Sequence, residues 1–254
     1  LGHILNENEN KYQPLFANDK DSIESIIKLF ADYDLSVLPI VGYKNTLIGR
    51  ITADDIHDIV QENATEQIYH LAGAGDSSAY QDSFKSTLKS RFSWLFVNLL
   101  TAILASSVVA LFADTIESIV ALAILMPIVA SMGGNAGTQT LTVLVRQIAL
   151  SEIKFKNYIS VIKKEFFLSL FNGCLFAIIT GIITYFWFES VFLGVIISIA
   201  MVLNLMTAGF FGAAIPIFLK KLKIDPAIGS TVILTTITDV IGFFAFLMLA
   251  KYFY

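Results

Sequence analysis

Long apolar runs separated by short polar segments make up the second half of this chain. Five runs reach the roughly 20 residues that an α-helix needs to cross about 30 Å of hydrocarbon. They cover approximately residues 92–113, 116–137, 166–188, 191–218 and 227–250. The pattern therefore predicts an α-helical membrane protein with five transmembrane helices.

Shorter and more polar patterns precede these runs. A helix is expected from Asp21, with Asp21 or Ser22 as its cap. Its apolar side chains recur at helical spacing on one face, namely Ile23, Ile26, Ile27 and Phe30.

Two short strands are expected next, at Val37–Val41 and Leu47–Thr52, around a turn at 42–45. A second helix then runs from Asp54 toward His70, and His70 is expected at the surface. This order predicts a small α+β unit ahead of the membrane helices.

Composition and charge separate the same two parts. Hydrophobic residues make up 56% of the 254 residues and the mean hydropathy is +0.71, which is too apolar for a soluble protein with an ordinary surface. Residues 1–83 hold fourteen acids and five bases, whereas residues 84–254 hold seven acids and twelve bases. We therefore expect an acidic soluble module at 1–75, a connecting amphipathic helix at 76–91 and a membrane domain at 92–254.

The basic residues beside the predicted spans indicate their orientation. Twelve Lys or Arg residues flank the spans, and eleven of them fall on one side. Cytoplasmic loops carry the excess of Lys and Arg. No basic and apolar leader follows Leu1, so the soluble module is expected to stay in the cytoplasm. Five spans in the cell (inner) membrane then place the N-terminus in the cytoplasm and the C-terminus outside.

Asp239 is the one ionisable side chain near the middle of a predicted span. A carboxylate at that depth is costly, and such residues usually line a water-filled path or bind a cation. Thr235 and Thr231 lie four and eight residues before it, so the three side chains share one helical face. This face offers only oxygen, which suits hard cations such as Mg²⁺, Ca²⁺ or Mn²⁺. The sequence thus predicts an ion-binding site within the membrane.

One carboxylate balances only half the charge of a divalent cation. A twofold homodimer brings two copies of Asp239 to its axis, so an ion path is expected at or near that axis. The alternative is structural: the threonines donate to carbonyls of their own helix, and Asp239 pairs with a base from another span. No Lys, Arg or His lies inside an apolar run to act as that base.

The second apolar run contains Pro127 and then the sequence SMGGNAGTQT at 131–140. Glycines destabilise a helix by roughly 1 kcal/mol each relative to Ala, and they expose the backbone. An ion path and close helix packing through small residues explain this stretch equally well. The candidate lining residues from this run are Gly133, Gly134, Asn135, Gly137 and Gln139.

Acidic residues gather on the second helix of the soluble module. Asp54, Asp55 and Asp58 lie in its first turns, with Glu62 and Glu66 further along. Acids in a first turn complement the helix dipole, so capping accounts for Asp54 and Asp55. The alternative is a cation-sensing surface.

Several stretches resemble one family. PIVASMGGNAGTQ, NLMTAGFFGAAIP and DPAIGSTVILTTITDVIGF are similar to the MgtE family of magnesium channels and transporters. YDLSVLPIVGYKNTLIGRITADD is similar to the second cystathionine-β-synthase (CBS) module of that family's cytosolic regulatory region. The resemblance covers nearly the whole chain from about residue 22, and it implies a homodimer with five spans per subunit and a central pore.

The resemblance also implies roles for residues in the membrane. In that family, an aspartate of the last span holds hydrated Mg²⁺ on the twofold axis, and the TTITD motif assigns this role to Asp239. Thr235 and Thr231 become weaker pore-lining candidates, and Asn204 joins the lining residues. Thr231 departs from the family, which often has another small or amide residue there.

Acidic residues of the family's CBS region bind Mg²⁺ and hold the pore shut. The metal-binding positions that this implies here are Asp34, Asp54, Asp55, Asp58 and Glu66. Asn63 and Gln67 stand where the family commonly has acids, which predicts fewer or weaker regulatory sites.

A nucleotide site is the weakest implication of the resemblance. Thr52 and Asp55 resemble the CBS nucleotide fingerprint, with ATP as the ligand. Such sites normally need a pair of modules, and of a first module only the LGHIL stretch is a candidate remnant.

We therefore expect a Mg²⁺ channel that imports the hydrated ion and is gated by cytosolic Mg²⁺. Its partners are a second copy of the chain, Mg²⁺ and the lipid bilayer, with no nucleic acid. No grouping of Ser, His and Cys and no phosphate loop is found, so an enzyme is not expected. Two alternatives stay open: an exchanger of Mg²⁺ for Na⁺ or H⁺ with GGNAG as a broken, rocking gate, and a membrane-anchored CBS sensor of magnesium or nucleotide.

Overall fold

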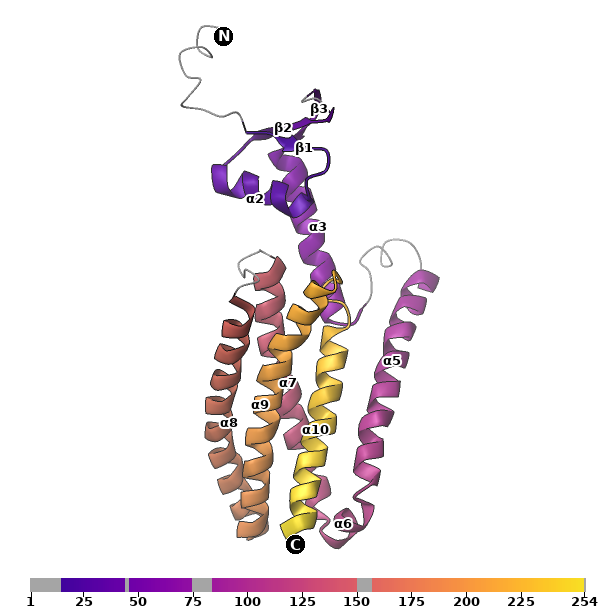
Figure 1. Cartoon of the computed structure of the whole chain (residues 1–254). Helices are drawn as coiled ribbons and strands as arrows, with labels where there is room; N and C mark the ends of the chain where they lie inside the picture. The colour runs from indigo at the N-terminus through magenta and orange to yellow at the C-terminus, as the bar shows by residue number, and fades with distance from the viewer. Residues whose placement is uncertain (1–14, 44–45, 75–83, 150–156, 254) are drawn as a thin grey trace. The chain divides into compact units, whose positions relative to one another are not determined.

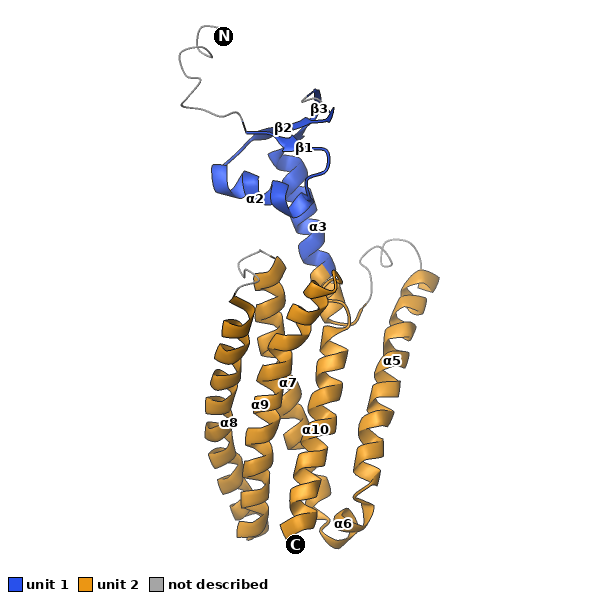
Figure 2. Cartoon of the chain, in the orientation of Figure 1, with its two compact units in different colours: residues 1–66 blue, residues 67–254 orange. Residues whose placement is uncertain are grey.

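A computed structural model describes residues 15–43, 46–74, 84–149 and 157–253. The chain forms two compact units, residues 1–66 and residues 67–254 (Figure 2). The LGHIL stretch and the tip of the predicted turn at 44–45 lie outside the described residues.

The first unit contains a three-stranded sheet with the order β1-β2-β3. Strand β2 (Val37–Val41) pairs antiparallel with β3 (Leu47–Thr52), which confirms both predicted strands. Strand β1 (Ala17–Asn18) pairs parallel with β2 and was not predicted, because two residues are too few to show an alternating pattern.

Helix α2 (Ile23–Tyr33) covers this sheet with the apolar face that the sequence predicts. Ser22 is its N-cap and accepts a hydrogen bond from the backbone N–H of Ser25. Ile26 and Phe30 are buried, and they form a small core with residues of β1, β2 and the next helix, namely Ala17, Leu38 and Ile56. The α+β unit is thus held by one compact apolar cluster.

Helix α3 (Ala53–Leu71) confirms the second predicted helix. His70, near its end, is only 5% exposed, so the expected surface position was wrong. The last turn of α3 belongs to the second unit, where Leu71 packs against a buried cluster that includes Leu141 and Leu234. Local sequence could not reveal this contact, because its partners lie far along the chain.

The second unit is a helical bundle (Figure 1). Its long helices are α5 (Phe84–Ala110), α7 (Ala121–Ala149), α8 (Tyr158–Phe188), α9 (Val191–Lys221) and α10 (Ser230–Phe253), with the short α6 (Ala113–Ser118) between α5 and α7. Among the described residues, these five long helices have the length and apolar composition needed to cross a membrane. The predicted fold class is confirmed.

The helices extend beyond the apolar runs. Helix α5 begins at Phe84, so the described part of the expected connecting helix 76–91 is continuous with the first span. Helix α7 ends at Ala149, twelve residues after the run 116–137, and α8 begins at Tyr158, eight residues before the run 166–188. Hydropathy detects only the part of a helix that suits hydrocarbon, and polar turns continue past it.

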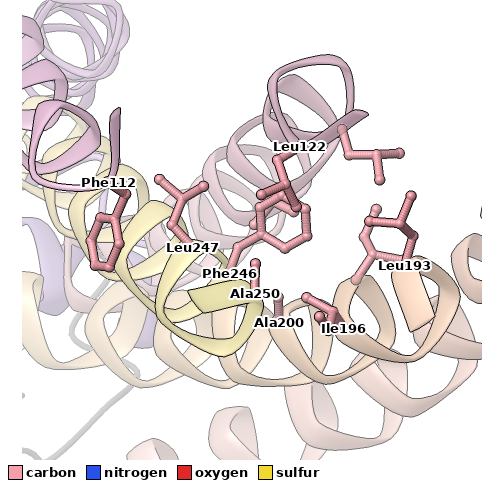
Figure 3. Close-up of a cluster of buried hydrophobic side chains, with 11 residues drawn as sticks. Phe112, Leu122, Leu193, Ile196, Ala200, Phe246, Leu247 and Ala250 are labelled. Atoms are coloured by element: carbon pink, nitrogen blue, oxygen red, sulfur yellow. The ribbon is translucent and has the colours of Figure 1, made fainter. Parts of the chain in front are cut away.

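Helix α9 occupies the centre of the bundle, in contact with α7, α8 and α10. A cluster of buried apolar side chains holds the end of the bundle near the C-terminus, and its members include Phe246 and Leu247 of α10 and Ile196 and Ala200 of α9 (Figure 3). Further along, small residues let the backbones approach closely, as helix association in lipid generally requires. A Cβ on Gly212 would lie 2.9 Å from the backbone oxygen of Gly137.

Gly212→Ala is therefore expected to destabilise the bundle. The added methyl group meets backbone, which has no flexible end to move aside, and such overpacking typically costs about 1–3 kcal/mol. Gly134→Ala is the matched control, because its Cβ would meet only Thr235 Cγ2 at 3.8 Å. We expect a lower melting temperature for Gly212→Ala in detergent, and equal values for the two variants would contradict the close approach of α7 and α9.

Candidate functional site

Helix α10 carries the polar face that the sequence predicts. Thr231, Thr235 and Asp239 follow one another at successive turns, and all three are partly exposed. The Thr235 hydroxyl donates to the carbonyl of Thr231 at 3.0 Å, as the structural alternative expected. The Thr231 hydroxyl instead donates to the carbonyl of Leu71 at 2.8 Å. Each hydroxyl oxygen keeps lone pairs that can accept a further hydrogen bond.

The surroundings of Asp239 contain no counter-charge among the described residues. Across the part of the chain that the structure describes, no Lys, Arg or His forms an ion pair with its carboxylate and no donor binds it. The second half of the structural alternative, a base from another span, is therefore not found among these residues. The carboxylate remains available to a ligand.

The SMGGNAGTQT stretch is helical from end to end. Helix α7 continues without a break from Ala121 to Ala149, so the break in GGNAG that the exchanger alternative expected is wrong. Four polar residues of α7 lie exposed on successive turns, namely Ser131, Asn135, Gln139 and Thr142. The sequence interpretation had missed Thr142, which lies beyond the run 116–137.

The polar faces of α7 and α10 adjoin each other. A Cβ on Gly134 would lie in ordinary contact, 3.8 Å, with Thr235 Cγ2. Asn135 follows Gly134 and donates to Ser131 Oγ at 3.3 Å. Exposed polar side chains gain nothing from lipid, so this continuous polar surface is suited to water or an ion.

Three other candidate lining residues lie inside the bundle. Gly133, Gly137 and Asn204 are buried, and they pack between helices rather than on the polar surface. A Cβ on Gly133 would lie 2.7 Å from Asn204 Cγ, and one on Gly137 would lie 3.0 Å from Leu234 Cδ2. Close packing therefore explains these glycines, while Gly134, Asn135 and Gln139 stay on the accessible side.

The sequence interpretation missed a polar pair between α7 and α8. The Thr140 hydroxyl donates to the carboxylate of Glu165 at 3.4 Å, and Glu165 is partly buried. Glu165 lies one residue before the run 166–188, so it was not counted inside a span. The start of α8 at Tyr158 places it within the helix.

One of the acidic residues of the first unit has a local structural role. Thr52 and Asp55 form a reciprocal capping box at the start of α3. The Thr52 backbone N–H donates to Asp55 Oδ2 at 2.9 Å, and its hydroxyl donates to the same oxygen at 2.6 Å. These hydrogen bonds, with the hydroxyl of Thr52 as the largest cause, lower the pKa of the Asp55 carboxyl. The capping interpretation of Asp55 is confirmed, and the residues of the nucleotide fingerprint bind each other.

The remaining regulatory candidates are exposed and dispersed. Asp34 ends α2 in a left-handed conformation, Asp54 and Asp58 are exposed on α3, and Glu66 is partly exposed. Among the described residues, no group of three or more His, Cys, Asp or Glu side chains is close enough to hold a metal ion.

Comparisons with known proteins match both units. A CBS domain model matches residues 10–62, and the MgtE model, described as a divalent cation transporter, matches residues 126–249. The second match contains the polar faces of both α7 and α10. This chain belongs to the MgtE family.

Three MgtE relatives are described as "Magnesium transporter MgtE". The chain is 33% identical to the one from Bacillus subtilis, over 98% of the chain and 57% of the relative. It is 32% identical to the one from Thermus thermophilus, over 90% of the chain and 51% of the relative. It is 28% identical to the one from Enterococcus faecalis, over 100% of the chain and 54% of the relative. The chain thus spans about half the length of these relatives. MgtE is a family of transporters and not of enzymes, and this member is a multi-pass membrane protein with five candidate spans.

Asp55→Ala is expected to loosen the first turn of α3 in this MgtE chain. The substitution removes the acceptor of two hydrogen bonds from Thr52, whereas Asp54→Ala, its neighbour, removes only an exposed charge. Hydrogen–deuterium exchange of the peptide around residues 50–58 in metal-free buffer is expected to rise for Asp55→Ala alone. Because the pKa of Asp55 is lowered, its contribution is present above the ordinary carboxyl pKa and is lost as the pH falls through the lowered value. Equal exchange in the two variants would contradict the capping box.

Proposed function

We propose that this MgtE chain forms a Mg²⁺ channel, in which hydrated Mg²⁺ passes along the polar faces of α7 and α10 and is held at Asp239. The observation that carries the proposal is the Asp239 carboxylate, which lies on an accessible polar face with no basic partner among the described residues. A charge in this position is costly unless water or a cation reaches it. The transported cation is its natural counter-charge.

Mg²⁺ fits the donors on this surface. It binds oxygen ligands, and it gives up its water shell reluctantly. Hydroxyl, amide and carboxylate oxygens from Thr235, Asn135 and Asp239 can accept hydrogen bonds from the waters of a hydrated ion. Recognition through the water shell therefore costs less than stripping the ion.

A second copy of the chain completes the proposed path. One protomer leaves the polar faces of α7 and α10 open on one side, and a single carboxylate carries half of the charge required. A twofold homodimer closes the surface and supplies the second Asp239. The N-terminus lies in the cytoplasm in this proposal, because eleven of twelve flanking basic residues then fall on the cytoplasmic side. The membrane potential drives the cation inward.

Cytosolic Mg²⁺ is the proposed regulator. Helix α3 begins with the acidic residues of the CBS module and ends at Leu71, whose carbonyl accepts the hydroxyl of Thr231 on the ion-binding helix. Binding of Mg²⁺ to Asp58 and Glu66 can thus bias a helix that is bonded directly to α10. ATP has no step in this proposal.

Asp239→Asn is expected to lower Mg²⁺ uptake into proteoliposomes at least about tenfold, since it removes the charge that balances the ion. Asp114→Asn makes the same chemical change on the exposed helix α6 and is expected to leave uptake unchanged. Dimer assembly, measured by light scattering, should be the same for both. Undiminished uptake by a well-folded Asp239→Asn protein would reject the proposed ion site and would favour a membrane-anchored sensor. Uptake that disappears when a Na⁺ or H⁺ gradient is collapsed would favour an exchanger.

Asp58→Asn is expected to reduce the inhibition of Mg²⁺ currents by cytosolic Mg²⁺. Asp58 has no capping bond in the structure, so its loss leaves α3 intact, in contrast to Asp55. Asp32→Asn, an exposed acid at the end of α2, is the matched control. Currents from patches or planar bilayers, recorded as cytosolic Mg²⁺ is raised, give the inhibition constant. The same constant for Asp58→Asn and wild type would count against this regulatory site.

A further inference from the structure

Asn204 lies at the point where α9 meets α7 and α10. Its side chain is fully buried in the membrane unit. The side-chain Nδ2 donates to the backbone oxygen of Val129 on α7 at 2.7 Å. This contact identifies the nitrogen of the amide, because a carbonyl oxygen accepts but cannot donate.

Two glycines form a socket for this amide. A Cβ on Gly133 of α7 would lie 2.7 Å from Asn204 Cγ, and a Cβ on Gly242 of α10 would lie 2.8 Å from Asn204 Nδ2. Any larger residue at either position would displace the amide. The socket is therefore built by the two helices that carry the exposed polar faces.

The glycines that contact the Asn204 amide lie close in sequence to the residues where the two polar faces meet. Gly133 precedes Gly134, the residue of α7 that adjoins Thr235. Gly242 follows Asp239 by three residues, which is about one helical turn. A change in how far the Asn204 side chain inserts between α7 and α10 therefore changes the separation of the two polar faces.

Packing stability alone does not explain an asparagine in this position. Among the residues that the structure describes, the buried Asn204 Oδ1 has no hydrogen-bond partner. A buried acceptor without a donor is unfavourable, and an apolar side chain of similar size would avoid that cost. What an asparagine supplies at this position is therefore the Nδ2 donor, whose hydrogen bond to Val129 holds the backbone of α7.

We propose that Asn204 is a positioning residue for ion conduction, whose amide holds α7 and α10 at the separation that makes their polar faces one ion-binding surface. The proposal rests on the proposed function above. Asn204 does not contact the ion. It acts through Val129, Gly133 and Gly242.

Ser198 provides a matched control on another face of α9. Its hydroxyl lies 2.8 Å from the backbone oxygens of both Ala177 on α8 and Gly194 on α9, either of which can accept its proton, and a Cβ on Gly181 would collide with it. The chemistry is similar, because a polar side chain of α9 donates to a backbone oxygen of a neighbouring helix beside a glycine, although Ser198 is only partly buried. Its partners lie on α8, away from the α7 and α10 faces.

The first test measures helix positions without ion flow. Gly134→Cys and Thr235→Cys are combined in full-length chain that carries Cys174→Ser, since Cys174 is otherwise a free thiol. Asn204→Leu, which removes the donor at similar size, is expected to change the rate of disulfide formation between α7 and α10 by roughly two- to tenfold. Ser198→Ala is expected to leave this rate unchanged.

The second test measures discrimination between cations. Uptake of Mg²⁺ and Ca²⁺ into proteoliposomes gives a ratio that mere loss of folded protein does not alter. Asn204→Leu and Asn204→Asp, which both lack the Nδ2 donor, are expected to lower this ratio by roughly two- to tenfold. Ser198→Ala is expected to lower the melting temperature and keep the ratio.

A double variant separates positioning from packing. Gly133→Ala alone is expected to lower the melting temperature, because its methyl group enters the socket. Adding Asn204→Ala makes room for that methyl group, so the melting temperature should rise again while the Mg²⁺ to Ca²⁺ ratio stays low. Recovery of both quantities would show that the socket serves packing only, and would overturn the proposal.

These experiments distinguish a failure of the ion site at Asp239 from a failure of the positioning role of Asn204. If Asp239→Asn retains full uptake while Asn204→Leu still changes the disulfide rate, the ion site is rejected and the positioning of the helices stands. If uptake depends on Asp239 but Asn204→Leu has the wild-type disulfide rate and ion ratio, the positioning role is rejected.

Discussion

The close approach of α9 to its neighbours is the constraint on which the rest of the membrane unit depends. Helices in lipid gain little from burying apolar surface, so they associate through tight packing and hydrogen bonds. Helix α9 uses both. A Cβ on Gly209 or Gly212 would come within 2.9 Å of a backbone oxygen of α8 or α7, and Ser198 and Asn204 donate to carbonyls of the same two helices. Together with the close contact between Asn204 and Gly242 of α10, they place α7 and α10, and with them the polar surface on which Asp239 lies.

This packing separates two sets of residues on α7. Gly133 and Gly137 face the buried side, where they admit Asn204 and Leu234. Ser131, Asn135 and Gln139 lie on the exposed side. Consecutive residues of a helix differ by about 100° in direction, so one stretch of sequence can supply both a packing face and a polar face. The glycine-rich motif therefore contains a packing face, as one of its two interpretations expected, and a separate polar face that the proposed ion path uses.

The soluble unit shows a similar division among its acids. Asp55 accepts two hydrogen bonds from Thr52 and stabilises the start of α3. Asp58 has no such local function in the contacts described above, and its exposed carboxylate stays accessible to a cation. In the proposed function, α3 links the acidic surface to α10, because the Leu71 carbonyl at the end of α3 accepts the hydroxyl of Thr231.

The apolar runs by themselves determined the five membrane helices, because a backbone in hydrocarbon must satisfy its own hydrogen bonds and a run of that length does so only as a helix. The sequence also determined both longer strands, the Ser22 cap and the shared face of Thr231, Thr235 and Asp239, since each follows from spacing within a few residues. Only the tertiary structure decided that Gly133, Gly137 and Asn204 are packed inside the bundle, that Glu165 lies within a helix beside Thr140, and that His70 is buried. The physical reason is that the environment of a side chain is set by neighbours on other helices. Asn204 and Val129 are 75 residues apart in the chain, a separation over which local periodicity carries no information about contact.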